Sequence, residues 1–392
     1  MRASARPDFS AAFAVLQAEV EAGRLAGVSA AVQLNGETVG QLCCGLADLA
    51  TTQPLRHDHI HRAFSNTKLI TSTLALMLVD QGRLSLDAPV KTWLPALGRL
   101  RVSRPGATTL DDTEPLARDI TLRHLLTHQA GFSHGVFDPG TLLFDAYLAS
   151  GVRGHQTTLA EMIEALAALP LRFQPGEGWE YSMATDVVAR LIEVVTGQSF
   201  GDALQAQLLG PLGMVDTGFV LSAAQAPRLA TLYVGDPLDP QKPGLRPLPN
   251  TPWPEAYLSP VPRQSGAGGM VTTQADMLAL LGALRPASAT AVLAPATLAA
   301  LFTDQLPPQR CVQFLHTGPV PGLGFGLGGA VSRSGAGPAA ALGELQWGGL
   351  AGTHWLMAPA CGLAVVVMTQ RFMGFWHPSW FAFKARLYAA LD

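Results

Sequence analysis

The sequence predicts an α+β fold in which segments from both ends of the chain form one antiparallel sheet flanked by helices. Short apolar stretches of strand length stand near both ends, whereas helical periodicity and long Pro- and Gly-rich connections fill the middle. A chain of 392 residues is long enough for such a sheet and for a mainly helical region inserted into it. We expect residues 1–104 and 263–392 to form the sheet domain and residues 105–262 to form the inserted helical domain.

The first expected elements are a helix, a hairpin and a buried helix. Residues 9–22 have helical periodicity. Residues 28–34 and 38–44 are typical of two antiparallel strands, because the Asn35-Gly36 pair between them tolerates the positive φ of a tight turn. Residues 69–79 carry no charge and are apolar on all sides of a helix, so we expect that helix to be buried.

The remaining elements divide into a helical middle and a mixed C-terminal part. Helices are expected in the middle over residues 122–127, 159–169 and 186–196. After Gly266 we expect, in order, a helix over 276–284, strands near 325–331, 345–349, 353–357 and 363–369, and an amphipathic helix over 378–391. The strands near both ends can complete a single sheet.

Composition excludes several classes of function. Charged residues make up 14 % of the chain, against about 25 % in an average soluble domain. The net charge is −3 and no run of like charge occurs, so we expect no nucleic-acid partner. No uncharged apolar run approaches the roughly 20 residues of a membrane span. Asp8 and Glu19 flank the first apolar stretch, which is wrong for a signal peptide, and we therefore expect a cytoplasmic protein.

The strongest local signal for chemistry is Ser65-Asn66-Thr67-Lys68, which opens the uncharged helix. The spacing places Ser65 and Lys68 on one helix face, with Cβ atoms about 5–6 Å apart. A lysine at the start of an uncharged helix is at least partly desolvated, and the helix N-terminus favours a developing anion. The alternative is an ordinary lysine at a helix end, because this spacing also arises by chance.

A tyrosine can supply the base that such a serine needs. At pH 7 a free lysine or tyrosine is only about 0.1 % deprotonated, and a Lys–Tyr pair removes most of that penalty because ammonium and phenolate attract each other. Tyr181 is a good candidate among the five tyrosines, since it follows a Pro- and Gly-containing turn and opens the next helix. The alternative is a core tyrosine with a hydrogen-bonded hydroxyl.

The third element is Trp347-Gly348-Gly349-Leu350 at the end of an expected strand. Paired glycines allow a substrate carbonyl to approach the strand N–H groups closely. Glycines used only to turn a hairpin explain the pattern equally well.

Together these residues resemble family VIII carboxylesterases, the esterases that share the fold of class C β-lactamases and penicillin-binding proteins. Ser65-Asn66-Thr67-Lys68, Tyr181-Ser182-Met183 and Trp347-Gly348-Gly349 stand in the order and at about the spacing of that family's S-x-x-K, Y-x-x and W-x-G motifs. The resemblance spans nearly the whole chain and includes the flanking stretches 124–128, 174–176, 265–269 and 349–355. It implies a β-lactamase/transpeptidase-like fold with the active site at the interface of the two domains.

The resemblance also implies a role for each residue. Ser65 would be the acylated nucleophile, and Lys68 and Tyr181 would share the work of general base and general acid. The N–H groups of Ser65 and Leu350 would form the oxyanion hole. The substrate would contact the following residues: Trp347, Gly348, Gly349 and Met183.

Two departures from β-lactamases favour ester hydrolysis. Met183 stands where those enzymes carry Asn, and Trp347-Gly348-Gly349 replaces Lys-Thr-Gly, so an amide and a cationic anchor for a β-lactam are missing. We expect hydrolysis of small esters with short- to medium-chain acyl groups, without a cofactor or metal. A β-lactam or amide hydrolase, an acyltransferase and, from another class, a non-catalytic sensor module stay open, and the sequence gives no oligomeric state.

Other motifs have plainer explanations. Gly131-Phe132-Ser133-His134-Gly135 matches the G-x-S-x-G elbow of α/β-hydrolases but lacks the required strand before it. Residues 324–329 match G-x-G-x-x-G but are followed by no helix. His124 and His128 lack the glutamate of a zincin, and the alternating histidines over 57–61 have no carboxylate cluster.

The walls of the pocket are expected to come from two long connections. Residues 132–158 contribute Phe137, Phe144 and Tyr147, and residues 236–262 contribute Trp253 and Tyr257. Long loops positioned by a rigid scaffold commonly carry binding residues.

Overall fold

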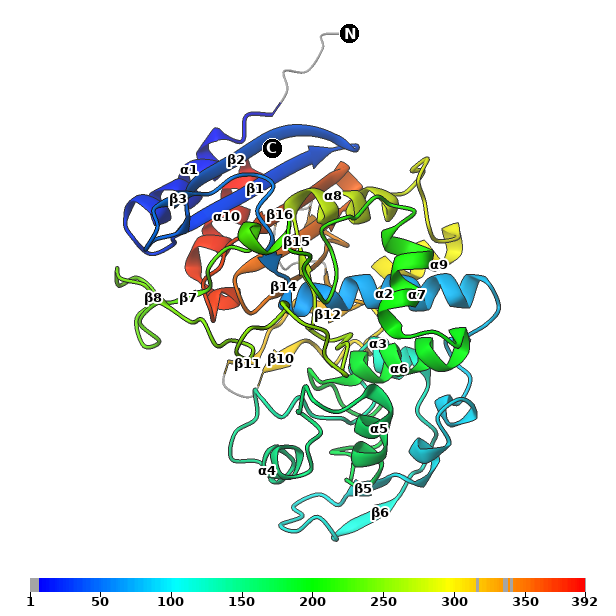
Figure 1. Ribbon diagram of the computed structural model, residues 1–392. Helices are drawn as coiled ribbons and strands as arrows, with labels where there is room; N and C mark the ends of the chain where they lie inside the picture. The colour runs from blue at the N-terminus through cyan, green and yellow to red at the C-terminus, as the bar shows by residue number, and fades with distance from the viewer. Residues whose placement is uncertain (1–6, 315–316, 334–337, 339–340, 392) are drawn as a thin grey trace.

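The computed structural model describes residues 7–314, 317–333, 338 and 341–391. Its largest element is an eight-stranded antiparallel sheet in the order β12-β13-β14-β15-β16-β1-β2-β3 (Figure 1). The strands are β1 (Gly27–Leu34), β2 (Glu37–Asp48), β3 (Gln53–Pro54), β12 (Leu323–Phe325), β13 (Ala330–Ser332), β14 (Leu345–Gly349), β15 (Thr353–Ala358) and β16 (Leu363–Met368). Because β16 pairs with β1, the two ends of the chain form one sheet, and the predicted α+β class is confirmed.

The helices follow the prediction closely at both ends. They are α1 (Ser10–Glu21), α2 (Thr67–Asp80), α3 (Leu122–Leu126), α4 (Leu142–Ala149), α5 (Leu159–Ala167), α6 (Ala184–Thr196), α7 (Phe200–Leu204), α8 (Gln274–Ala283), α9 (Pro295–Phe302) and α10 (Pro378–Ala389). Of these, α4, α7 and α9 were not predicted. Short strand pairs complete the fold: β4 (His61–Arg62) with β9 (Val271–Thr272), β5 (Arg101–Ser103) with β6 (Thr113–Pro115), β7 (Tyr233–Val234) with β8 (Arg246–Pro247), and β10 (Gln313–Phe314) with β11 (Gly318–Pro319).

Side-chain alternation along the central strands builds two cores. Successive side chains of a strand point to opposite faces. Accordingly, Val365 and Val367 pack with α1 and α10 in one cluster, whereas Val366 and Met368 belong to the larger cluster that contains α2, α6 and α8. Figure 1 shows α1 and α10 together beside the strands from the chain ends, with α2 on the other side. The uncharged helix is therefore buried between the sheet and the middle of the chain, as predicted.

One predicted strand is wrong. The expected strand near 325–331 is two short strands, β12 and β13, joined by a turn that the Gly326 N–H closes on the Gly329 carbonyl at 2.7 Å. Gly328 has a φ of 149°, which a side chain would disfavour, so the glycines of this segment make a hairpin and no phosphate loop.

Residues 105–262, in cyan and green in Figure 1, hold the helices α3 to α7 and the short strands β6, β7 and β8, and their description as a mainly helical inserted domain stays a prediction. The boundaries at 104/105 and 262/263 also stay a prediction, because β5 and β6 pair across the first of them. No helix among the described residues is long and apolar enough to cross a membrane.

Candidate active site

Ser65 lies in a single 3-10 turn, Phe64–Asn66, that runs directly into α2. The residue before it, Phe64, has a φ of 44°. This left-handed conformation costs a non-glycine residue roughly 1–2 kcal/mol and is held only where its surroundings fix it. Strained backbone of this kind clusters at functional sites, and here it sets the position of the serine.

The three predicted catalytic side chains lie together, with the other two in contact with Ser65 Oγ. Tyr181 Oη lies 2.6 Å from Ser65 Oγ, and Lys68 Nζ lies 3.3 Å from the same Oγ. A fourth group joins them, because Trp347 Nε1 donates to Tyr181 Oη at 3.2 Å. Ser65 Oγ is therefore within hydrogen-bonding reach of the nearby Lys68 amine and of a phenol that lies 116 residues further along the chain.

Lys68 is only 3 % exposed, which confirms the predicted desolvation. Its Nζ donates to the Ala267 carbonyl at 2.7 Å and lies 4.6 Å from the centre of the Tyr181 ring. No carboxylate of the described residues forms an ion pair with it. An ammonium held by a carbonyl, a hydroxyl and an aromatic face leaves its charge available to a phenolate at Tyr181.

Asp186 fixes the loop that supplies the Ala267 carbonyl. This buried residue of α6 accepts from Ser265 Oγ at 2.7 Å and from the Ala267 N–H at 3.0 Å. Gly266 allows the close approach, since a Cβ there would lie 2.8 Å from the Thr185 carbonyl. Sequence reasoning noted the glycines of 265–269 but missed Asp186, whose only signal was an acidic residue in an apolar helix.

Two neutral histidines hold the Tyr181 ring. His134 stacks on it at a centroid distance of 5.3 Å, and His128 contacts it at 4.9 Å. Burial and the nearby Lys68 ammonium lower the pKa of His134 to about 3 and hold that of His128 well below its ordinary value. Both rings are therefore uncharged at neutral pH and add no second cation beside Lys68.

The glycines of Trp347-Gly348-Gly349 are required by the protein's own backbone. A Cβ at Gly349 would collide with the Ala63 carbonyl just before the nucleophile turn, and one at Gly348 would lie 2.8 Å from the Thr353 carbonyl. Gly349 thus lets the end of β14 pack directly against residues 63–64. Leu350 and Ser65 line the same small cavity, and their role as an oxyanion hole stays a prediction.

Gly349→Ala is expected to destabilise the fold by about 1–3 kcal/mol, because an added methyl cannot displace a backbone carbonyl. Turnover is expected to fall as well, since the strain falls on the backbone that leads into Ser65. The measurements are Tm by calorimetry and kcat for p-nitrophenyl butyrate. Gly282→Ala in α8 is the matched control, as a Cβ there meets nothing within 4 Å and is expected to be neutral or stabilising. Equal Tm values for the two variants would contradict the packing argument.

Two larger cavities share wall side chains with a small cavity at the nucleophile. The smallest is lined by Ser65, Tyr181, Trp347, Gly348, Leu350 and four aromatic rings, those of Phe137, Phe314, Phe375 and Trp376. A cavity of about 340 Å³ continues past Trp347 and is lined mostly by apolar side chains. Another of about 320 Å³ lies beyond the Tyr181 ring and is partly polar. Two chemically different cavities, one mostly apolar and one partly polar, therefore lie next to the cavity at Ser65.

The predicted walls need correction. Phe137 lines the site as expected, but Phe144, Tyr147 and the residues of 236–262 line none of these cavities. Trp253 and Tyr257 instead pack in a separate cluster. Phe314, Phe375 and Trp376 take their place. Met183 is buried in the core and lines none of these cavities, so its contact with substrate stays a prediction.

The competing motifs have structural roles. Ser133 lies in a segment without a strand and donates to Asp138 at 2.5 Å, so the G-x-S-x-G elbow is absent. His124 belongs to the cap of α3. His61 is buried with its Nδ1 at 3.0 Å from the His59 carbonyl. In the described part of the chain, no group of three His, Cys, Asp or Glu could hold a metal ion.

Several known proteins are similar to this chain over most of its length. The family model described as Beta-lactamase matches residues 12–379. Esterase EstB of Burkholderia gladioli is 35 % identical, covering 96 % of this chain and 94 % of its own. Acyltransferase calJ of Penicillium decumbens is 29 % identical over 82 % of this chain and 78 % of its own. The solved structure of EstCE1, a hydrolase with promiscuous acyltransferase activity, superimposes with a TM-score of 0.80 at 26 % identity over 96 % of this chain and 97 % of that one.

Proposed function

The chain belongs to the beta-lactamase family, and we propose that it hydrolyses carboxylic esters through an acyl-Ser65 intermediate, as a carboxylesterase of the family VIII type. The observation that carries the proposal is the meeting of Ser65 Oγ with Tyr181 Oη at 2.6 Å and Lys68 Nζ at 3.3 Å. A hydroxyl within hydrogen-bonding reach of a phenol and an amine that together can take up its proton is the arrangement of an activated nucleophile. The similarity to esterase EstB supports esters as the substrate class.

Acylation follows from this arrangement. Ser65 Oγ attacks the ester carbonyl while its proton passes to the Lys68/Tyr181 pair, and the Ser65 and Leu350 N–H groups stabilise the oxyanion. When the C–O bond to the alcohol breaks, Tyr181 returns the proton to the departing oxygen. The Trp347 indole holds Tyr181 Oη in place through its 3.2 Å hydrogen bond.

Deacylation repeats the sequence with water. The water gives its proton to the same pair as it attacks the acyl carbon, and the Ser65 oxygen leaves with that proton. None of these steps calls for a metal or cofactor. We further propose a cytoplasmic enzyme that acts on small molecules and not on nucleic acid.

The acyl group fits the apolar cavity beyond Trp347. Its volume of about 340 Å³ and its aromatic lining, which includes Phe375, Trp376 and Trp380, suit a short to medium hydrocarbon chain. This direction leads away from Tyr181, the group that meets the leaving alcohol.

Incubation with p-nitrophenyl butyrate in water is expected to yield butyric acid and p-nitrophenol in equal amounts, with one acyl group carried transiently on Ser65. Chromatography measures the two products, and mass spectrometry of peptides from quenched enzyme detects the acylated Ser65. Turnover without any acylated Ser65 peptide would contradict the proposal. Nitrocefin serves as the comparison substrate and is expected to turn over at least about 100-fold more slowly, because Trp347 replaces a cationic anchor.

Acyl transfer is the second candidate function. It is favoured by the similarity to acyltransferase calJ and to EstCE1. The same acyl-Ser65 intermediate would pass its acyl group to an alcohol in place of water. Repeating the incubation with added alcohol decides between the two, since a new butyrate ester as the major product identifies a transferase.

A further inference from the structure

We propose that the cavity beyond the Tyr181 ring binds the alcohol part of the ester, and that this alcohol is polyhydroxylated, such as a sugar or a cyclic polyol. The cavity has a volume of about 320 Å³ and combines aromatic rings with charged side chains. The inference rests on the proposed esterase function and adds the class of alcohol.

The position of the cavity assigns it to the alcohol. It adjoins the Ser65 cavity at three shared side chains, those of Phe137, Tyr181 and Phe314. Tyr181 lines both cavities, and its hydroxyl returns the proton to the departing oxygen, so we assign the alcohol to the cavity that begins behind its ring. The apolar cavity beyond Trp347 lies on the other side and remains for the acyl chain.

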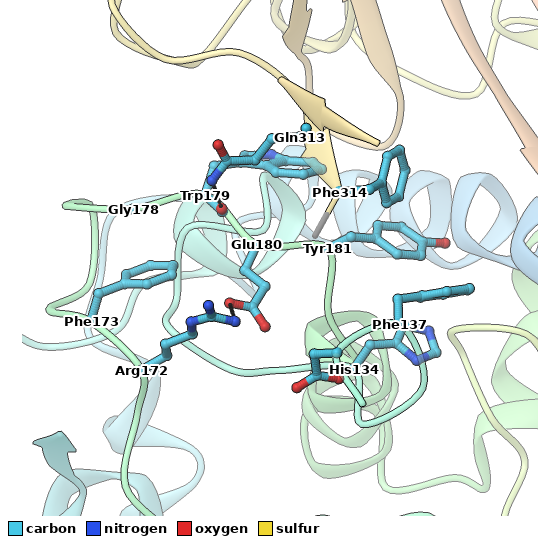
Figure 2. Close-up of a pocket in the computed structure, with 12 residues that line it drawn as sticks. His134, Phe137, Arg172, Phe173, Gly178, Trp179, Glu180, Tyr181, Gln313 and Phe314 are labelled. Carbon is cyan, nitrogen blue, oxygen red and sulfur yellow. Dashed lines mark hydrogen bonds and ion pairs between the residues drawn. The ribbon is translucent and has the colours of Figure 1, made fainter. Parts of the chain in front are cut away.

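The polar wall offers hydrogen-bond donors and acceptors together. Arg172 Nη1 lies 2.8 Å from Glu180 Oε2, and Figure 2 shows these two side chains directed toward each other, away from the Tyr181 hydroxyl. Asp138 is only 4 % exposed, and its Oδ1 has no hydrogen-bond partner in the described structure. Gln313 lines the same cavity. A buried acceptor without a partner marks a wall with unused hydrogen-bonding capacity.

The charges of this wall favour a neutral ligand. Burial and the neighbouring Asp138 carboxylate raise the pKa of Glu180 to about 7, against the opposing effect of Arg172. A cationic alcohol would meet Arg172, and an anionic one would meet Asp138 and Glu180. Hydroxyl groups donate and accept at once, so they match a guanidinium beside carboxylates without adding charge.

The apolar walls complete the argument. Phe173 and Trp179 stand on different sides of the Arg172–Glu180 pair in Figure 2, and Phe137 and Phe314 line the part of the cavity that adjoins the Ser65 cavity. Ring faces pack against the C–H surface of a saturated ring while its hydroxyls reach the charged groups. A purely apolar alcohol would instead strip water from the ion pair without replacing its hydrogen bonds, which is unfavourable.

Two butyrate esters of similar shape test the proposal. One is the ester of the primary hydroxyl of methyl glucopyranoside, and the other is cyclohexylmethyl butyrate, which has the ring without the hydroxyls. We expect kcat/KM to favour the sugar ester by at least about tenfold. Glu180→Gln is expected to lower that ratio about fivefold or more, mainly through KM. The matched control is Glu177→Gln in the same loop. Glu177 pairs with Arg118, is half exposed and lies outside the cavity. The preference of this variant for the sugar ester is therefore expected to equal that of the wild type.

Equal or reversed preference in the wild type would overturn the proposal, and so would a stronger preference for the butyrate ester of choline, which identifies a cation site. Calorimetric measurement of sugar-ester binding to the Ser65→Ala variant tests the cavity without turnover. Absence of turnover with intact binding contradicts the esterase function alone, whereas absence of binding contradicts this inference. The wild-type ratio and the binding measurement decide the matter even where Glu180→Gln does not fold.

Discussion

Ser65→Ala is expected to lower kcat/KM for p-nitrophenyl butyrate by more than about 10³-fold, because no acyl-enzyme can form without the hydroxyl. The substitution removes one oxygen that accepts from Tyr181 and Lys68. Tyr181 keeps its contact with the Trp347 indole, so the fold is expected to persist with an unchanged circular dichroism spectrum. Steady-state kinetics measure kcat/KM, and labelling with a fluorophosphonate probe reports whether a reactive serine remains.

The control for this variant is Ser133→Ala, which removes the serine of the rejected G-x-S-x-G motif. Ser133 is fully buried and bonded to Asp138, so a probe has no access to it. Labelling of Ser133→Ala is expected to stay at one probe per chain, whereas Ser65→Ala stays unlabelled. Labelling of Ser65→Ala together with retained turnover would show that the nucleophile lies elsewhere.

The parts of the site that sequence could predict are those with local chemical signatures. Ser65 and Lys68 share a helix face by their spacing, and an uncharged helix after them implies burial. Tyr181 carried no such signal of its own, since a tyrosine after a turn is common. It was found because the Lys68 side chain needed a partner and because the order of motifs resembled a known family.

The parts that could not be predicted depend on tertiary contacts between distant segments. The aromatic lining from Phe314, Phe375 and Trp376 is assembled by the short β10 strand and by the loop after β16, far from the loops expected to form the walls. The histidines that pack on Tyr181 looked like fragments of other motifs. The same limit applies to the fold: a single sheet shared by strands of both chain ends followed from strand patterns, whereas the particular β1–β16 pairing and the β12–β13 hairpin did not.

Tyr181→Phe is expected to reduce kcat/KM for ethyl butyrate by about 10²–10⁴-fold, the usual contribution of a positioned acid–base group. The phenol at 2.6 Å from Ser65 Oγ is placed both to accept the serine proton and to return it to the alcohol. A p-nitrophenolate leaves without a proton, so only the first of these tasks matters for p-nitrophenyl butyrate. We therefore expect a smaller loss with the p-nitrophenyl ester than with the ethyl ester, measured as the ratio of the two kcat/KM values.

Comparison with Lys68→Met separates the two members of the pair. Lys68 Nζ lies 3.3 Å from Ser65 Oγ and 4.6 Å from the centre of the Tyr181 ring, so its positive charge supports a phenolate at Tyr181 as well as contacting the serine. If the two groups act as one proton-transfer unit, the double variant loses little more than the worse single variant, because each substitution already disables the unit. If the losses of the two single variants simply multiply in the double variant, Lys68 and Tyr181 act independently. If Tyr181→Phe lowers kcat/KM equally for both esters, Tyr181 does not protonate the alcohol.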